Sequence, residues 1–202
     1  MELNVAWAHD AAERDCADRL LRIEVARILG SSPHSVSVAR LCGACGSSRH
    51  GRPYVLPYGA MSVSHVSISR AGSLAMVAVT RCGPVGVDVA CVRDFESDQL
   101  DEVLLHPAEH AADPIARART WARKEALLKA TGDGLRIDPR TIRVTGADEP
   151  PGLVGSATPL TTLQPRLYDV EVDEAHVACV CVLGRAPKRL SARGAALAAP
   201  VC

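Results

Sequence analysis

The sequence predicts a mixed α/β (α+β) fold with two pseudo-symmetric halves, each a small sheet with one long helix, and a cleft between them. Three observations predict it: short apolar runs of strand length, two segments with helical periodicity, and a change of charge near residue 93. The chain has 202 residues, which suits one domain or two small ones. We expect an N-terminal half over 1–93, a C-terminal half over 94–185 and a mobile tail over 186–202.

Composition excludes several classes of protein. Apolar residues are 48% and charged residues 23%, which is typical of a globular chain. Lys and Arg total 23, as do Asp and Glu, so the basic excess of a general nucleic-acid-binding protein is missing. No apolar run is long enough to cross a membrane, and the N-terminus has no signal-peptide pattern. We therefore expect a cytoplasmic protein whose eight cysteines are thiols.

In the N-terminal half, alternating apolar runs predict strands and one amphipathic stretch predicts a helix. The helix is expected between Asp10, which can cap its start, and Gly30, which can end it. Residues 42–57 are rich in turn formers. The expected strands cover 3–8, 35–41, 62–69, 74–80 and 85–92.

The C-terminal half begins with a marked separation of charge. Residues 94–113 contain seven acids and no Lys or Arg, whereas 117–143 contain eight bases and three acids. Both segments can be solvated faces, or the basic one can steer an acidic partner; the two interpretations have equal weight. A long helix is expected over 115–131, with Gly132 as its stop. Strands are expected at 141–145, 166–172 and 177–183, and a loop at 149–159.

Two short motifs have residues that suit chemistry on a phosphate. In the strand motif Gly86-Val87-Asp88-Val89-Ala90, alternation places Asp88 and Ala90 on one face. In the helical motif Trp121-x-x-Lys124-Glu125-x-x-x-Lys129, one broad face contains Glu125 and both lysines. Each motif alone also fits a solvated surface. Together, Asp88 and Glu125 offer the hard oxygen ligands of Mg²⁺, and Lys124 and Lys129 offer charges for a diphosphate.

The two motifs have the spacing of a known family. Gly-Val-Asp-Val, followed about 33 residues later by Trp-x-x-Lys-Glu-Ala-x-x-Lys-x-x-Gly-x-Gly-Leu, resembles the paired signature of the 4′-phosphopantetheinyl transferase superfamily. The resemblance covers roughly residues 15–185. It is closest to the two-halved branch that acts on carrier proteins of secondary-metabolite biosynthesis. Gly51-Arg52-Pro53 resembles a further motif of that branch.

The resemblance implies an activity and its partners. Such enzymes transfer the 4′-phosphopantetheine group of coenzyme A to a serine of an acyl or peptidyl carrier protein. They require Mg²⁺, with Mn²⁺ as an alternative, and release adenosine 3′,5′-bisphosphate. A monomer suffices in this branch, and neither nucleic acid nor membrane is a partner.

The resemblance also assigns roles by motif position. Asp88 and Glu125 would be the metal ligands, and Glu125 would be the base for the serine hydroxyl, directly or through water. Lys124 and Lys129 would hold the diphosphate, so Glu125, Asp88 and Lys129 form the expected catalytic set. Arg52 would contact the nucleotide end of coenzyme A.

Two departures from the family pattern bear on the site. The family has a third acid where this chain has Ala90, so we expect water in its place and weaker metal binding. The family's Ser-His pair for the 3′-phosphate has two candidates here. Residue identity favours Ser64 with His65, whereas the spacing to Asp88 favours Ser69 with Arg70, because one strand and a turn need fewer residues than the 23 that separate His65 from Asp88. Arginine is a sound substitute for histidine, since its guanidinium group binds phosphate well, and we give more weight to Ser69 with Arg70.

Rival functions remain at this stage. One is a non-catalytic module that binds coenzyme A or a carrier protein, and another is a metal-dependent phosphohydrolase. A zinc-binding domain is the most distant. Cys42-x-x-Cys45 with His50 resembles half a zinc site, and His34 is a fourth candidate at unusual spacing. A cysteine-containing turn before Gly51 is the simpler interpretation.

Overall fold

The computed structural model describes residues 1–9, 16–43, 45–56 and 65–195, and the chain divides into two compact units. Unit 1 comprises Met1–Arg81 and Pro187–Cys202, and unit 2 comprises Cys82–Ala186. The predicted boundary near residue 93 is wrong, because the strand containing Asp88 pairs with a strand of unit 2 along its whole length. The mixed α/β fold class is confirmed, with one long helix and a sheet in each unit.

Unit 1 is built on a four-stranded sheet with the order β11-β1-β5-β4. β5 runs antiparallel to β1 and β4, and β11 runs parallel to β1. The prediction of a mobile tail over 186–202 is wrong for β11. Arg193 of that strand forms an ion pair with the buried Glu24, which anchors the segment. The strands are β1 (Glu2–His9), β4 (His65–Ala71), β5 (Leu74–Thr80) and β11 (Arg189–Gly194).

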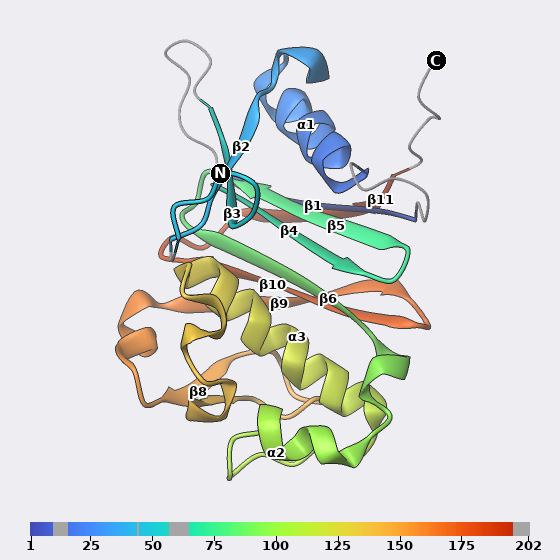
Figure 1. The fold of residues 1–202 in the computed structure, drawn as a ribbon, viewed down its shortest axis with the longest axis vertical. Coiled ribbons are helices and arrows are strands. Elements are labelled where there is room, and N and C mark those ends of the chain that lie inside the picture. The colour runs from blue at the N-terminus through green and yellow to red at the C-terminus, as the bar shows by residue number, and fades with distance from the viewer. Residues whose placement is uncertain (10–15, 44, 57–64, 196–202) are drawn as a thin grey trace. The chain divides into compact units, whose positions relative to one another are not determined.

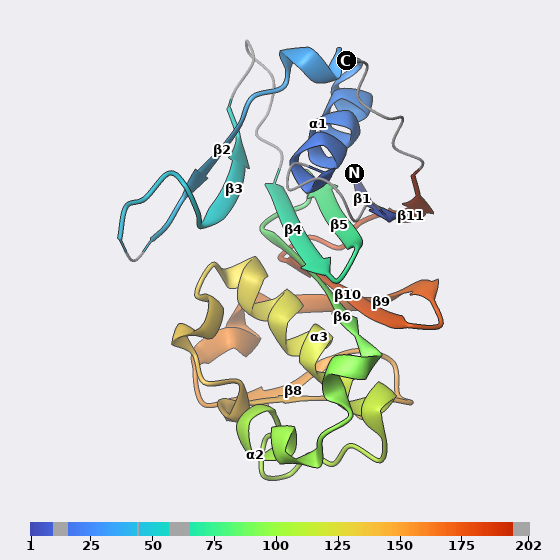
Figure 2. The ribbon, with the colours of Figure 1, turned by 45° about the vertical axis from the view of Figure 1, so that its right-hand side comes forward.

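The helix α1 (Cys16–Leu29) covers one face of this sheet, as both views of the ribbon show (Figures 1 and 2). Its buried Leu20 and Val25 pack in one cluster with side chains of β1, β4 and β5, such as Val77. This is the amphipathic packing that the sequence predicts. The predicted cap, Asp10, lies outside the described residues.

A separate two-stranded sheet joins β2 (Val38–Leu41) to β3 (Arg52–Val55). β2 starts later than predicted because Pro33–Ser35 forms a short 3₁₀ helix. β3 lies within the stretch predicted as turns. Pro53 hides it in the sequence, since proline is uncommon inside strands, although it is tolerated where no partner strand needs its N–H.

Unit 2 has an antiparallel sheet of three strands, in the order β6 (Val85–Cys91), β10 (His176–Leu183) and β9 (Pro165–Asp173). The helix α3 (Pro114–Thr131) packs across this sheet (Figure 1). Asp113 caps α3 by accepting the Ala116 N–H, and Gly132 ends it in the left-handed conformation at φ +85°. Among the described residues, no helix is both long and apolar enough to cross a membrane.

The remaining elements of unit 2 are short. The strand β8 falls in the predicted loop 149–159, and it pairs with β7. The strands are β6 (Val85–Cys91), β7 (Ile142–Val144), β8 (Leu153–Ser156), β9 (Pro165–Asp173) and β10 (His176–Leu183), and the short helix is α2 (Asp101–Leu104). Five 3₁₀ helices cover Val92–Phe95, Asp98–Leu100, Gly134–Arg136, Pro139–Thr141 and Pro159–Leu163.

The backbones of α3 and β6 approach very closely in unit 2. A line of fully buried alanines on α3 faces the sheet (Ala118, Ala122, Ala126 and Ala130). Opposite them, a Cβ added to Gly86 would lie 2.0 Å from the Ala126 carbonyl oxygen and 2.4 Å from the Ala130 nitrogen. Only glycine fits at this position, because backbone atoms cannot rotate away as a side chain can.

We expect Gly86→Ala to lower the free energy of unfolding by about 1–3 kcal/mol or more, because the new methyl group would clash with the backbone of α3. Chemical unfolding of the full chain measures this loss. Gly155→Ala is the matched control, since nothing lies within 4 Å of a Cβ at Gly155. Equal stability of the two variants would contradict the close approach of α3 to β6.

Candidate active site

The first part of the site is an ion pair between β6 and α3. Asp88 lies on the face of β6 that Gly86 also occupies, toward α3, and it is only 5% exposed. Lys129 Nζ donates to Asp88 Oδ1 at 2.6 Å and to the Val87 carbonyl oxygen at 3.1 Å. The interpretation of Asp88 as a residue on a solvated face is therefore wrong. The Lys129 side chain is 28% exposed, so the pair reaches the surface on the lysine side.

Glu125 brings a second carboxylate to the same place. It precedes Lys129 by one helical turn, and its Oε1 atom is buried with no hydrogen-bond partner among the described residues. Burial raises the pKa of Glu125, the negative charge of Asp88 raises it further, and Lys129 partly opposes both. Two carboxylates and one ammonium group thus share a small region of unit 2, as the sequence predicts.

The residues present fit a hard divalent cation. The buried, unpartnered oxygen of Glu125 and the neighbouring carboxylate of Asp88 are the kind of donors that Mg²⁺ prefers. Ala90 adds no ligand, because its methyl side chain has no donor atom, and it is buried in the alanine-rich core cluster beneath α3. A cation here would therefore take its other ligands from solvent or substrate.

Lys124 does not belong to this site, which corrects the prediction that it holds a diphosphate. Its side chain is 0% exposed. Its ammonium group donates to Glu109 Oε2 at 2.5 Å, to the Leu104 carbonyl oxygen at 2.7 Å and to the Pro139 carbonyl oxygen at 3.0 Å. Because an ammonium group has three donors, these acceptors satisfy it fully. Burial lowers the pKa of Lys124, and Glu109 opposes that shift.

Glu109 is a residue whose importance the sequence analysis missed. Besides Lys124, it accepts the backbone N–H groups of His106 and Val144, each at 2.7 Å. It therefore joins the segment before α3 to the helix and to β7. The available signal was its place in the acidic segment, 15 residues before a lysine of the basic one.

Other charges of the two segments also pair internally. Arg117 is buried and donates to Asp101 Oδ1 at 2.5 Å. Arg123 is buried and donates to both oxygens of Asp169, at 3.1 and 2.6 Å, and to carbonyls of the loop 145–149. These arginines are not available to steer a partner, and neither are they solvated. For Arg117 and Arg123, neither a solvated face nor the steering of an acidic partner is therefore the right interpretation of the charge separation.

In unit 1, Arg52 and His65 form a second group of predicted site residues. Arg52 is exposed at the start of β3, and His65 is half-buried at the start of β4. Burial lowers the pKa of His65, and the nearby positive charge of Arg52 lowers it further. The two side chains are thus close enough to interact, and both can donate to a phosphate.

The two candidate residue pairs for the 3′-phosphate differ in the face of β4 on which their basic side chains lie. Alternation places His65 and Ser69 on one face and Arg70 on the other, which is also the face of Val66 and Ile68 in the cluster beneath α1. Ser69 is buried and Arg70 is exposed. Ser64 lies outside the described residues.

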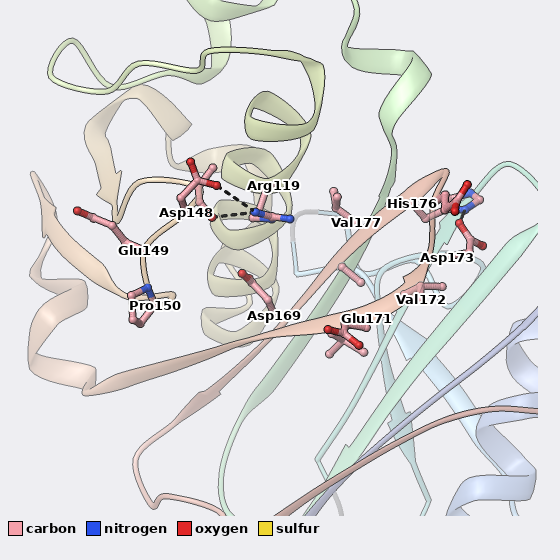
Figure 3. A pocket seen from close by; sticks show the side chains of 14 residues that line it. Arg119, Asp148, Glu149, Pro150, Asp169, Glu171, Val172, Asp173, His176 and Val177 are labelled. Carbon is pink, nitrogen blue, oxygen red and sulfur yellow. Dashed lines mark hydrogen bonds and ion pairs between the residues drawn. The ribbon is translucent and has the colours of Figure 1, made fainter.

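A hollow of unit 2, of about 770 Å³, lies elsewhere and suits anions poorly (Figure 3). It does not include Asp88, Glu125 or Lys129 in its lining. Arg119 and His176 are its basic side chains. Acidic side chains dominate it: Asp148, Glu149, Asp169, Glu171, Asp173 and Glu174. Repulsion between like charges would disfavour a diphosphate there.

We expect Lys124→Met to destabilise the protein by about 3–5 kcal/mol, because it leaves the Glu109 carboxylate buried without its cation. Glu109→Gln should also be destabilising. The double variant should lose less than the sum of the two single losses, since no buried charge is left unpaired. Chemical unfolding of the four proteins measures this coupling. Strictly additive losses would show that Lys124 and Glu109 are not paired.

Comparison with known proteins places this site within a recognised family. Residues 84–181 match the model of the 4′-phosphopantetheinyl transferase superfamily, and this range contains Asp88, Glu125 and Lys129. A search among curated proteins returned no match. A solved holo-(acyl-carrier-protein) synthase from Bacillus anthracis str. Ames, in complex with CoA (3′,5′-ADP), is 20% identical with a TM-score of 0.40. The similarity covers 51% of this chain and 96% of that one. The match assigns residues 84–181, just under half of the chain, to the 4′-phosphopantetheinyl transferase superfamily.

Proposed function

We propose that this protein transfers the 4′-phosphopantetheine group of coenzyme A to a serine hydroxyl of an acyl or peptidyl carrier protein. The observation that carries the proposal is the grouping of Asp88, Glu125 and Lys129 within the segment that matches the superfamily. In the reaction, the serine oxygen forms a bond to the β-phosphorus of coenzyme A. The bond to the leaving phosphate breaks, and adenosine 3′,5′-bisphosphate departs.

Glu125 is suited to take the proton from the serine hydroxyl, directly or through water. Its carboxylate is largely buried and beside Asp88, so its pKa is raised. A raised pKa makes a carboxylate a stronger base, which brings it closer to the operating pH of a general base. The buried and unpartnered Oε1 atom is free of competing hydrogen bonds among the described residues.

Lys129 and Asp88 control charge at the diphosphate. Lys129 is the partly exposed member of the ion pair, so its ammonium group can reach a substrate phosphate while Asp88 keeps it oriented. Asp88 and Glu125 would hold Mg²⁺, or Mn²⁺ as an alternative, which when bound supplies charge neutralisation of the diphosphate oxygens. Lys124 has no part in this, because its donors are already used.

Arg52 and His65 are the groups of unit 1 that we assign to the nucleotide end of coenzyme A. Their proximity to each other supports a shared phosphate contact. We favour His65 over Arg70 as the 3′-phosphate ligand, because Arg70 lies on the face of β4 opposite to that of His65. Ser69 shares the face of His65 and completes this set.

The transfer is tested by intact-mass spectrometry of apo acyl and peptidyl carrier proteins incubated with the full chain, coenzyme A and Mg²⁺. The carrier should gain the mass of one phosphopantetheine group. Glu125→Gln should slow this gain by about 100-fold or more, because it removes the base. Glu171→Gln is the matched control, an exposed carboxylate of the same unit, and should leave the rate unchanged.

Two results would contradict the transfer. Cleavage of coenzyme A with no mass gain on either carrier would identify a phosphohydrolase. Binding of coenzyme A with neither cleavage nor mass gain would identify a binding module, in which the missing acid at Ala90 is the first cause to examine.

The 3′-phosphate assignment is tested by comparing coenzyme A with 3′-dephospho-coenzyme A. His65→Ala should raise KM for coenzyme A by about tenfold or more, the usual weight of a hydrogen bond to a charged group, and leave KM for the dephospho compound unchanged. Arg70→Ala should alter neither value. The opposite result, with discrimination lost only in Arg70→Ala, would assign the phosphate to Arg70.

A further inference from the structure

A second cluster of metal-binding residue types lies in unit 1, in the loop 42–51 between β2 and β3. Among the described residues, Cys42, Cys45 and His50 bring one possible ligand atom each to within 4.8 Å of one another. Cys45 Sγ is 3.4 Å from His50 Nε2. We propose that these three residues bind one zinc ion, with the fourth position taken by water.

The geometry of the cluster is close to that of a tetrahedral site. Zinc binds sulfur at about 2.3 Å and imidazole nitrogen at about 2.0–2.1 Å, so tetrahedral angles separate the ligand atoms by about 3.5–3.8 Å. The Cys45–His50 distance already approaches this value, and the 4.8 Å limit leaves only small side-chain rotations to complete the site.

The backbone of the loop supports this arrangement independently of the side chains. The Gly46 N–H donates to the Cys42 carbonyl oxygen, and the Cys42 N–H donates to the Ser47 carbonyl oxygen, each at 2.9 Å. These bonds join the backbone of Gly46 and Ser47, which follow Cys45, to that of Cys42. Gly51 then lets the loop close against β2, because its φ of +104° and the 2.4 Å from an added Cβ to the Leu41 carbonyl oxygen both require glycine.

The hairpin is held to the rest of unit 1 at its edge only, where Val38 and Val55 pack against the core cluster and Arg40 pairs with Asp18. None of the residues of β2 or β3 is buried, and Leu41 and Tyr54 are among the exposed large apolar side chains. A two-stranded hairpin is marginal on its own, and the loop 42–51 is longer than the usual two to five residues. A metal ion that joins Cys42 to His50 closes this loop, as staples do in small structures with little core.

The chemistry and the charge balance suit zinc. Two thiolates and a neutral imidazole are soft and borderline donors, which select zinc over Mg²⁺. Binding forms two Zn–S bonds and one Zn–N bond and releases the two thiol protons to solvent, which leaves the site neutral. His34, which the sequence offers as a fourth ligand, is not part of the cluster that the described residues form.

The test is the metal content of the full chain, which does not depend on the proposed transferase activity. The protein is stripped of metal, reduced, refilled with Zn²⁺ or Co²⁺ and separated from unbound ion. We expect about one zinc per chain by mass spectrometry of the metal. With Co²⁺, we expect thiolate-to-cobalt charge-transfer absorption and the d–d bands of a tetrahedral ion.

Variants assign the ligands. Cys42→Ser, Cys45→Ser and His50→Ala should each lose the bound zinc, from about one equivalent to a trace. Cys91→Ser, in β6, and His34→Ala, outside the cluster, should retain it. The proposal is overturned if the reduced wild-type chain binds neither ion stoichiometrically, or if the three ligand variants keep their zinc. Isolation of the wild type under anaerobic conditions with Cys42 and Cys45 joined as a disulfide would also overturn it.

Discussion

The close approach of β6 to α3 at Gly86 is the constraint on which the candidate active site depends. Asp88 lies two residues beyond Gly86 on the same face of the strand, so the distance between the backbones sets how far its carboxylate lies from the helix. Glu125 and Lys129 lie one turn apart on that helix. A side chain at position 86 would move both elements apart, and the 2.6 Å contact of Lys129 with Asp88 would be lost.

Charge pairing explains why the site could be predicted only in part from the sequence. The motif spacing correctly groups Asp88, Glu125 and Lys129, because strand alternation and helical periodicity are local rules. Lys124 shares the helical motif but points to a different partner, Glu109, in the acidic segment that precedes α3. That pairing depends on how the acidic segment folds back on the helix, and no local pattern encodes it. Arg117 pairs likewise with Asp101 of the acidic segment, whereas Arg123 pairs with Asp169 of β9, which is also distant in sequence.

The fold shows the same division between local and long-range information. The two long helices and most of the strands were predictable, because their apolar periodicity is strong and turn residues flank them. The strand β11 was not, since it is a parallel partner of β1 from the far end of the chain and has polar, exposed residues. β3 and β8 were missed for another reason, because each is only four residues long and contains Pro53 or Gly155, residue types that are uncommon inside strands.

We propose above all that Asp88 and Glu125 together hold one divalent cation that acts on the diphosphate of coenzyme A. Calorimetric titration of Mg²⁺ into the full chain with coenzyme A present tests it most directly. We predict one Mg²⁺ site in the wild type, a marked loss of Mg²⁺ affinity in both Asp88→Asn and Glu125→Gln, and no change of affinity in Glu171→Gln. Wild-type affinity in both Asp88→Asn and Glu125→Gln would contradict it.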